Sequence, residues 1–332
     1  MPDEKTQDTR PPAKRAKWIQ WQKPMVTVLY AAVPPILGAV YFFGLRALLV
    51  LAACCATGFL CEWLFVRRQG KPVTSAVFVT CVLLALTLPP RTPIWIAMIG
   101  AVVAVVFGKM AFGGFGANTF NPALVGRCFL YVNFPKHLTS DWAAPFAGGI
   151  GGFGAWSADA VTTATPLDQF KAAGAVAPIR DLFLGNVGGS FGETSALLIL
   201  IGAAYLLYKK TANWRIMLSV LAGAVIYSAI LHGAGVSRVP PPHFTVFAGG
   251  LMFGAVYMAT DPISAARTPP GMVIYGMLIG VLTVTIRAFS GFSGGVNFAI
   301  LLANMLAPIT DYAVRAVKDK RKAAAALKKE AA

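Results

Sequence analysis

The chain has 332 residues, of which 57% are hydrophobic and 13% charged, and its formal net charge is +16. A soluble domain carries about a quarter charged residues, so the composition excludes an ordinary soluble protein and predicts an all-α polytopic membrane protein. The cationic excess lies at the two ends and in short loops, as expected for cytoplasmic Lys and Arg, so we expect no nucleic-acid partner. Five cysteines lie in apolar segments without a Cys-x-x-Cys pair, so we predict no metal or cluster site.

The chain begins with a polar, basic stretch, residues 1–24, which lacks the apolar core of a signal peptide. We predict a cytoplasmic tail that ends in a membrane-surface segment at Trp18 and Trp21. About ten hydrophobic segments follow, each near the roughly 20 residues that span a bilayer. The expected spans are 25–44, 46–66, 73–90, 92–109, 119–135, 190–208, 214–232, 244–260, 271–288 and 293–315.

The loops between these spans alternate in charge. Lys and Arg gather between the second and third spans, between the sixth and seventh, and in 317–332, whereas the opposite loops carry few. This alternation predicts that both termini are cytoplasmic and that the long connection 136–189 lies outside the membrane. The chain is therefore divided into a first membrane repeat (25–135), the outer connection and a second repeat (190–316), between two cytoplasmic tails.

An internal match favours the two repeats. Asn121-Pro-Ala-Leu-Val-Gly-Arg127 and Asp261-Pro-Ile-Ser-Ala-Ala-Arg267 share the pattern Asn/Asp-Pro-x-x-x-x-Arg. Five spans in each half would invert the second half, as in folds whose interrupted helices meet near the membrane midplane. A chance match of short proline motifs is the alternative. Because ionisable groups at this depth are costly and often functional, all four end residues are candidates for an ion pathway or for mutual neutralisation.

A glycine-rich stretch, Gly185-Asn-Val-Gly188-Gly189-Ser190-Phe-Gly192-Glu193, opens the sixth span. Ser190 and Glu193 have the spacing of a capping box, and a well-capped helix alone explains them. The glycines and exposed amides also suit close approach of a ligand or its phosphate. By contrast, Glu62 and Asp311 lie near the ends of spans, where we expect them to be solvated.

A hydroxyl-rich segment, Asp159-Ala-Val-Thr162-Thr-Ala164-Thr165-Pro166, lies in the outer connection. Proline disfavours the helical conformation for the residue before it, so we expect Thr165 to be extended with an accessible hydroxyl. A plain surface loop is the alternative for a bare Thr-Pro pair. The whole pattern Asp-x-x-Thr-x-Ala-Thr resembles the acceptor sequence at which a transferase joins the phosphate of FMN to the last Thr.

Four motifs in one order, at 113–127, 159–165, 188–195 and 258–265, resemble the RnfD subunit of the Rnf ion-translocating electron transport complex. They equally resemble its relative, the NqrB subunit of the sodium-pumping NADH:quinone reductase. The short N-terminus and Thr165-Pro166-Leu167 favour the Rnf protein, whereas 78–127 looks more like the reductase protein. The resemblance implies an electron-carrying subunit of a translocating oxidoreductase in the bacterial inner membrane, with no catalytic residues and no activity on its own.

The resemblance also implies cofactors and partners. FMN would be bonded through phosphate to Thr165 after action of an FMN transferase, with Gly188, Gly189, Ser190 and Glu193 around the flavin. A second, non-covalent riboflavin is a family-level expectation that no residue here identifies. Flavin-carrying, iron–sulfur and NADH-handling subunits would complete the complex, which moves Na⁺ or H⁺. A flavin-free secondary transporter or channel, or a structural anchor, is the rival interpretation.

Overall fold

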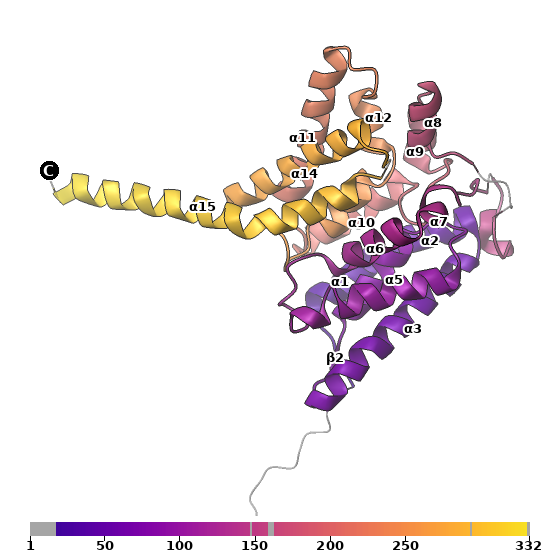
Figure 1. Ribbon diagram of the computed structural model, residues 1–332, viewed down its shortest axis with the longest axis horizontal. Helices are drawn as coiled ribbons and strands as arrows, with labels where there is room; N and C mark the ends of the chain where they lie inside the picture. The colour runs from indigo at the N-terminus through magenta and orange to yellow at the C-terminus, as the bar shows by residue number, and fades with distance from the viewer. Residues whose placement is uncertain (1–17, 147, 159–162, 293, 331–332) are drawn as a thin grey trace, which may run out of the picture.

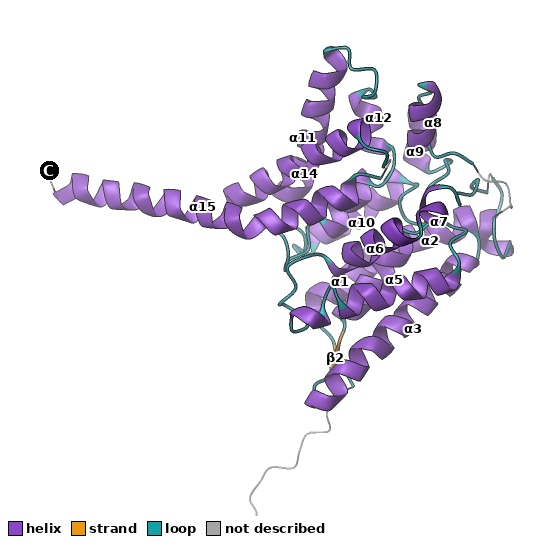
Figure 2. Cartoon of the chain, in the orientation of Figure 1, coloured by secondary structure: helices purple, strands orange, loops and turns teal. Residues whose placement is uncertain are grey.

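The computed structural model in Figure 1 describes residues 18–146, 148–158, 163–292 and 294–330. Helices dominate these residues, and Figure 2 shows how little else is regular. The strands among them are β1 (Ile19–Gln20) and β2 (Val73–Thr74), which pair in parallel. The predicted all-α class therefore holds apart from this short pair, which fastens the end of the N-terminal tail to the loop after the second span.

The first half contains six helices and two short turns of 3₁₀-helix in the described residues. Three helices are shorter than predicted: α4, α5 and α6 have 11, 13 and 12 residues. The elements are α1 (Lys23–Ala31), α2 (Val33–Phe43), α3 (Arg46–Val66), η1 (Arg67–Gln69), α4 (Ala76–Leu86), α5 (Ile94–Val106), η2 (Met110–Phe112) and α6 (Pro122–Asn133).

The connection and the second half follow. The last helix has 35 residues, runs through Pro308, takes in most of the predicted tail 317–332, and projects from the molecule (Figure 1). The elements are α7 (Pro135–Thr139), η3 (Gly151–Gly154), α8 (Pro166–Ala173), α9 (Ile179–Leu184), α10 (Ala196–Tyr208), α11 (Trp214–Gly233), α12 (Pro242–Phe247), α13 (Leu251–Phe253), the π-helical turn η4 (Gly254–Met258), α14 (Pro269–Phe289) and α15 (Val296–Glu330).

Six helices of the described chain are long and apolar enough to cross a membrane. They are Lys23–Phe43, Arg46–Gln69, Ile94–Phe112, Trp214–Gly233, Pro269–Phe289 and Val296–Ala325. The other four predicted spans are also helical, but their helices have at most 13 residues. One end of each is buried inside the bundle, as expected for interrupted helices whose ends are covered by protein; these ends are at Leu86, Pro122, Ala196 and Met258.

The two halves share one order of packing partners. In the first half α3 packs on α4 and α5, and α5 packs on α6. In the second half α11 packs on η4 and α14, and α14 packs on α15. This correspondence makes α6 the counterpart of α15, so the Asn121 and Asp261 motifs, which precede α6 and α14, are not equivalent. The two motifs therefore do not occupy equivalent positions in the two halves. They do lie side by side, because Asn121 donates to the carbonyl of Met258.

The Pro34-Pro35 pair explains the break between α1 and α2. In a continuous helix the carbonyl of Ala31 would accept from the amide of Pro35, which proline lacks. The Tyr257 hydroxyl, from the second half, donates to this carbonyl at 2.7 Å. Gly202 provides the space for this hydroxyl, because a Cβ at position 202 would overlap it.

The ends of α4 and η4 repeat this arrangement. Pro90 cannot donate to the carbonyl of Leu86, and the amide of Gly192 donates to it instead at 2.7 Å. Pro262 cannot donate to the carbonyl of Met258, which accepts from Asn121 Nδ2 at 3.2 Å. Each broken helix is thus completed by a donor from the other half of the chain.

One hydrophobic core runs through both halves, and a smaller one lies beneath the connection. The smaller core contains Leu167, Leu182, Phe244 and Ala248, and so holds α8 and α9 against α12. Since Thr165 immediately precedes α8, this packing fixes its position over the second half.

Candidate functional site

Thr165 is the N-cap of α8. Its backbone is extended, with φ −66° and ψ 158°, as the following proline predicts. Its Oγ1 accepts from the amide of Asp168 at 3.2 Å and donates to Asp168 Oδ2 at 2.6 Å. The prediction of an accessible hydroxyl is wrong in this state, because capping turns the side chain inward and leaves Thr165 9% exposed.

Thr165 opens onto a cavity that collects most of the predicted ligand-binding residues. We call it the Thr165 cavity. Its wall also contains Arg127, which the sequence suggested for the ion pathway, and three aromatic side chains. The lining residues include Arg127, Tyr131, Trp142, Thr165, Gly188, Gly189, Ser190, Glu193, Phe247, Gly249 and Gly250.

The cavity wall holds buried polar groups with unused bonding capacity. Arg127 is 4% exposed, and its Nη1 lies 3.6 Å from Glu193 Oε1, too far for a hydrogen bond. Within the described residues, Nε and Nη1 of Arg127 and Oγ of Ser190 have no hydrogen-bond partner. Buried donors without partners cost free energy, so these groups favour a ligand with acceptor oxygens.

Glycines keep this cavity open. A Cβ on Gly250 would lie 2.5 Å from Glu193 Oε1, and one on Gly188 would lie 2.8 Å from Thr163 Oγ1. Gly249 has φ +66°, a conformation that side-chain-bearing residues rarely adopt. The glycine-rich stretch therefore borders the cavity, as the sequence indicated.

The predicted capping box is wrong. The helix α10 begins only at Ala196, and its N-cap is Ser195, whose Oγ accepts from the Leu198 amide at 3.4 Å. The amides of Phe191 and Gly192 instead donate to the carbonyls of Leu88 and Leu86 beyond the end of α4, and Pro90 could not donate to Leu86. This leaves Ser190 and Glu193 free to line the cavity.

Three members of the acceptor pattern are less informative. Asp159 and Thr162 lie outside the described residues. Ala164 is exposed, and its carbonyl accepts from Gln169 Nε2 at 2.9 Å.

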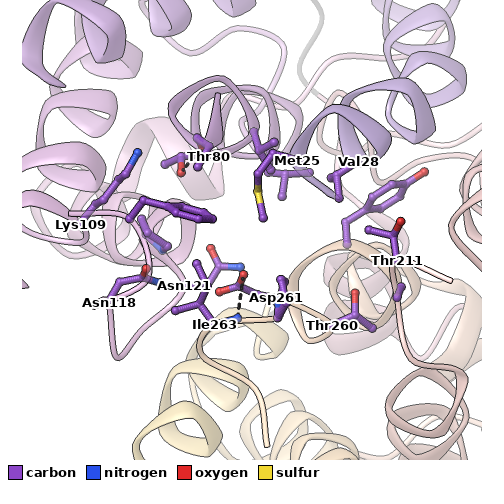
Figure 3. A pocket seen from close by; sticks show the side chains of 18 of the residues that line it. Met25, Val28, Thr80, Lys109, Asn118, Asn121, Thr211, Thr260, Asp261 and Ile263 are labelled. Carbon is purple, nitrogen blue, oxygen red and sulfur yellow. Dashed lines mark hydrogen bonds between the residues drawn. The ribbon is translucent and has the colours of Figure 1, made fainter. Parts of the chain in front are cut away.

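A second cavity lies between the two proline motifs, and Figure 3 shows its side chains. Asp261 and Asn121 line it side by side, together with Asn118, Thr80 and Thr260. Asp261 Oδ2 accepts from Ser264 Oγ at 2.7 Å, within its own turn. Among the described residues, no Lys or Arg forms an ion pair with Asp261. The cavity thus offers a carboxylate and neutral oxygens, a set that suits a hard cation.

Lys109 separates this Asp261 cavity from a larger one. Its Nζ donates to Glu62 Oε2 and to Thr74 Oγ1, each at 2.6 Å. Glu62 Oε1 accepts from the Thr74 amide at 2.9 Å, and Glu62 and Lys109 are each 1% exposed. Glu62 also lines a cavity of about 330 Å³. The expectation of a solvated Glu62 is wrong, because Glu62 and Lys109 neutralise each other inside the bundle.

The remaining candidates have local roles. Arg267 is exposed and lines none of the cavities found in the described chain. Asp311, expected to be solvated, is 8% exposed and accepts from the amides of Arg267 and Thr268 at 2.7 and 2.9 Å. Its carboxylate thereby holds the loop that leads into α14.

Comparison with known proteins identifies the family. Residues 10–319 match the model of the NQR2, RnfD, RnfE family. The B subunit of the Na(+)-translocating NADH-quinone reductase of Chromohalobacter salexigens is 41% identical over 289 residues, 83% of this chain and 66% of that protein. The D subunit of the Na(+)-translocating ferredoxin:NAD(+) oxidoreductase complex of Acetobacterium woodii is 38% identical over 315 residues, 92% of each chain. The chain belongs to this family.

Membership agrees with the apolar helices, and the protein is a multi-pass membrane protein. The NQR2/RnfD/RnfE relatives from the quinone reductases are longer: the chain covers 66% and 70% of two of them. Similarity to both types of relative confirms the resemblance drawn from the four motifs.

Sequence reasoning missed two residues of the site. Asp168 follows Thr165 by three positions, the spacing of an N-cap and its reciprocal acid, which is a readable signal. Lys109 carries no such signal, because its partner Glu62 is 47 residues away and becomes its neighbour only in the folded bundle.

Proposed function

We propose that this protein is the membrane subunit of an Rnf-type ion-translocating electron transport complex, carrying FMN bonded through its phosphate to Thr165. The named relatives are subunits of such complexes, and the alternative within the family is the NqrB subunit of the sodium-pumping NADH:quinone reductase. The observation that carries the proposal is the convergence of Thr165, the glycine-rich stretch and Arg127 on one cavity.

The residues of the Thr165 cavity fit this group. Arg127 and Ser190 offer unused donors to phosphate or to the polar edge of the ring, and Tyr131, Trp142 and Phe247 offer apolar surfaces. FMN, when bound, supplies one- and two-electron redox chemistry. The protein binds and orients the flavin. The positive charge of Arg127 favours negative charge in the cavity, and the negative charge of Glu193 weakens this preference.

Ion passage is assigned to the Asp261 cavity. Asp261 would bind the cation with help from the amide and hydroxyl oxygens around it. The Lys109–Glu62 pair lies between this site and the 330 Å³ cavity, so an ion entering there must pass it. A cation can be coupled to the redox state only if the protein's states differ in affinity for it. Na⁺ and H⁺ are both compatible with the oxygen groups in this cavity.

The further proposals follow from the family and from loop charge. Both termini are cytoplasmic, the Thr165 cavity faces outward, and the membrane is the bacterial inner membrane. The helix-packing correspondence supports two inverted repeats of five spans. An FMN transferase, iron–sulfur, NADH-handling and flavin-carrying subunits are the expected partners, and a non-covalent riboflavin remains a proposal without an assigned residue.

The decisive experiment places the flavin. The protein is made with its complex in a host that has the transferase, and the denatured chain is examined for flavin fluorescence and intact mass. The wild type and Thr165→Ser should gain the mass of FMN less water, whereas Thr165→Ala should not. Thr163→Ala is the matched control and should retain the flavin. A bare wild-type chain, or a flavin persisting in Thr165→Ala, would overturn the proposal.

The same experiment tests the rival from another class, a flavin-free secondary transporter or channel. The specific observation that favours it is Asp261, a carboxylate without an ion pair in the described chain that faces a cavity between interrupted helices. If wild-type protein lacks a flavin but moves cations in liposomes, the rival is supported.

A further inference from the structure

A further cavity is lined by Leu167, Phe170 and Lys171 of α8. Leu167 also borders the Thr165 cavity and separates the two. Three cations line this further cavity: Lys171 from α8, Arg238 from the loop before α12, and Arg287 near the end of α14. We call it the Arg287 cavity.

Arg287 is buried with most of its bonding capacity unused. It is 6% exposed, and its Nη1 donates to the carbonyl of Thr245 at 2.9 Å. Its Nε and Nη2 are buried and have no hydrogen-bond partner in the described part of the chain. These two nitrogens form one edge of the guanidinium, the edge that binds two oxygens of a carboxylate or phosphate side by side.

No acid among the described residues supplies those oxygens. Glu193 is close enough for its charge to interact with that of Arg287. Its carboxylate, however, lies 3.6 Å from Arg127 in the neighbouring Thr165 cavity. The Asp168 carboxylate accepts from the Thr165 hydroxyl instead. A buried guanidinium edge that faces no acid is costly, so the cavity favours an anion from outside the chain.

The other two cations stand at the exposed side of the cavity. Arg238 is exposed, and Lys171 is exposed with its Nζ 3.2 Å from the carbonyl of Ser290. Burial lowers the pKa of Lys171; Asp168 opposes this shift, and the positive charge of Arg287 adds to it. A bound anion would relieve this crowding of positive charge.

The position of the cavity indicates the source of the anion. It lies at the ends of α11 and α14 that carry exposed apolar side chains, such as Ile230 and Phe289, which are 61% and 55% exposed. In a membrane protein such side chains face lipid, so the cavity lies where acyl chains give way to headgroups. Free phosphate has the same oxygen chemistry but would gain nothing from this apolar border.

We propose that the Arg287 cavity binds a phosphate group, and that its source is the headgroup of an anionic phospholipid. Two phosphate oxygens would accept from Nε and Nη2 of Arg287, while Lys171 and Arg238 would neutralise the remaining charge. The site goes beyond the proposed function, because it needs neither the flavin nor electron transfer.

Native mass spectrometry of the delipidated complex tests this site. Short-chain phosphatidylglycerol, short-chain phosphatidylcholine and inorganic phosphate are titrated separately. Wild-type protein should bind phosphatidylglycerol more tightly than phosphatidylcholine, and Arg287→Gln should weaken that binding by about tenfold or more. Arg267→Gln removes an exposed arginine outside the cavity and should leave it unchanged. Flavin content is measured in parallel and should be equal in all variants, which separates this site from the Thr165 proposal.

Each outcome decides the question. Binding of inorganic phosphate that depends on Arg287, without selective lipid binding, would confirm the phosphate site but assign it to free phosphate. Equal lipid binding by wild type and Arg287→Gln, with no Arg287-dependent phosphate binding, would overturn the site. If Arg287→Gln fails to fold, Lys171→Gln replaces it; this exposed change should weaken lipid binding by about threefold, and no weakening would refute the proposal.

Discussion

Replacing Glu62 with glutamine tests the buried ion pair on which the proposed ion route depends. Glutamine has nearly the same shape, and its side-chain oxygen still accepts from the amide of Thr74, which donates to Glu62 at 2.9 Å. What is lost is the charge opposite Lys109, whose Nζ lies 2.6 Å from Glu62 in a site where both residues are 1% exposed. The change therefore isolates the electrostatic part of the contact.

The expected magnitude follows from that burial. Removing one partner of a buried pair costs about 3–5 kcal/mol, because the other charge stays desolvated and unpaired. Lys109→Met should cost a similar amount. In Glu62→Gln/Lys109→Met no charge remains, so the double variant should lose about 3 kcal/mol less than the sum of the two single changes.

The assay is unfolding in mixed micelles of increasing detergent fraction, followed by a thiol-reactive dye. Cys54 and Cys81 are each 0% exposed and become reactive only on unfolding. Lys71→Met is the matched control, since Lys71 is exposed on the same cavity, and it should change the free energy of unfolding by less than about 0.5 kcal/mol. Additive single effects, or a cost below about 1 kcal/mol for Glu62→Gln, would refute the reasoning.

Three further outcomes are expected. Asp261→Asn should reduce sodium uptake into liposomes by the reconstituted complex at least about tenfold while flavin on Thr165 is unchanged; undiminished uptake would remove Asp261 from the route. Gly202→Ala should destabilise the protein by about 1–3 kcal/mol in the same unfolding assay, because its Cβ displaces the Tyr257 hydroxyl from the Ala31 carbonyl. Thr165→Val should weaken α8 by about 1 kcal/mol, seen as faster hydrogen exchange at the Asp168 amide, whereas Thr165→Ser should not.

The sequence predicted where helices occur more reliably than how far they run. The long span 46–66 coincides with α3, because an uninterrupted apolar run of that length has one stable conformation in lipid. The shorter α4 and α10 were overestimated, since prolines and glycines at their ends stop them inside the bundle. Their remaining backbone groups form hydrogen bonds with residues distant in the sequence, and the local sequence pattern does not identify those partners.

The candidate site shows the same limit. Thr165 and the glycine-rich stretch could be singled out because each has a local signature, and both line one cavity. The position of Arg127 in this cavity could not be predicted, because its ion partner, Glu193, is 66 residues away and belongs to another motif. Ser190 and Glu193 fitted a capping box, but the proline-ended α4 competed successfully for the amides beside them.

The donors that complete the broken helices restrict how the two halves can move. Tyr257, Gly192 and Asn121 each cross from one half to a carbonyl of the other, at separate places in the bundle. Sliding the halves apart would strand the carbonyls of Ala31 and Leu86 in a medium without water, at several kcal/mol each. Any working cycle of this protein is therefore expected to keep the two halves in contact at these bonds, so that the cavities change shape by small local movements and not by separation of the halves.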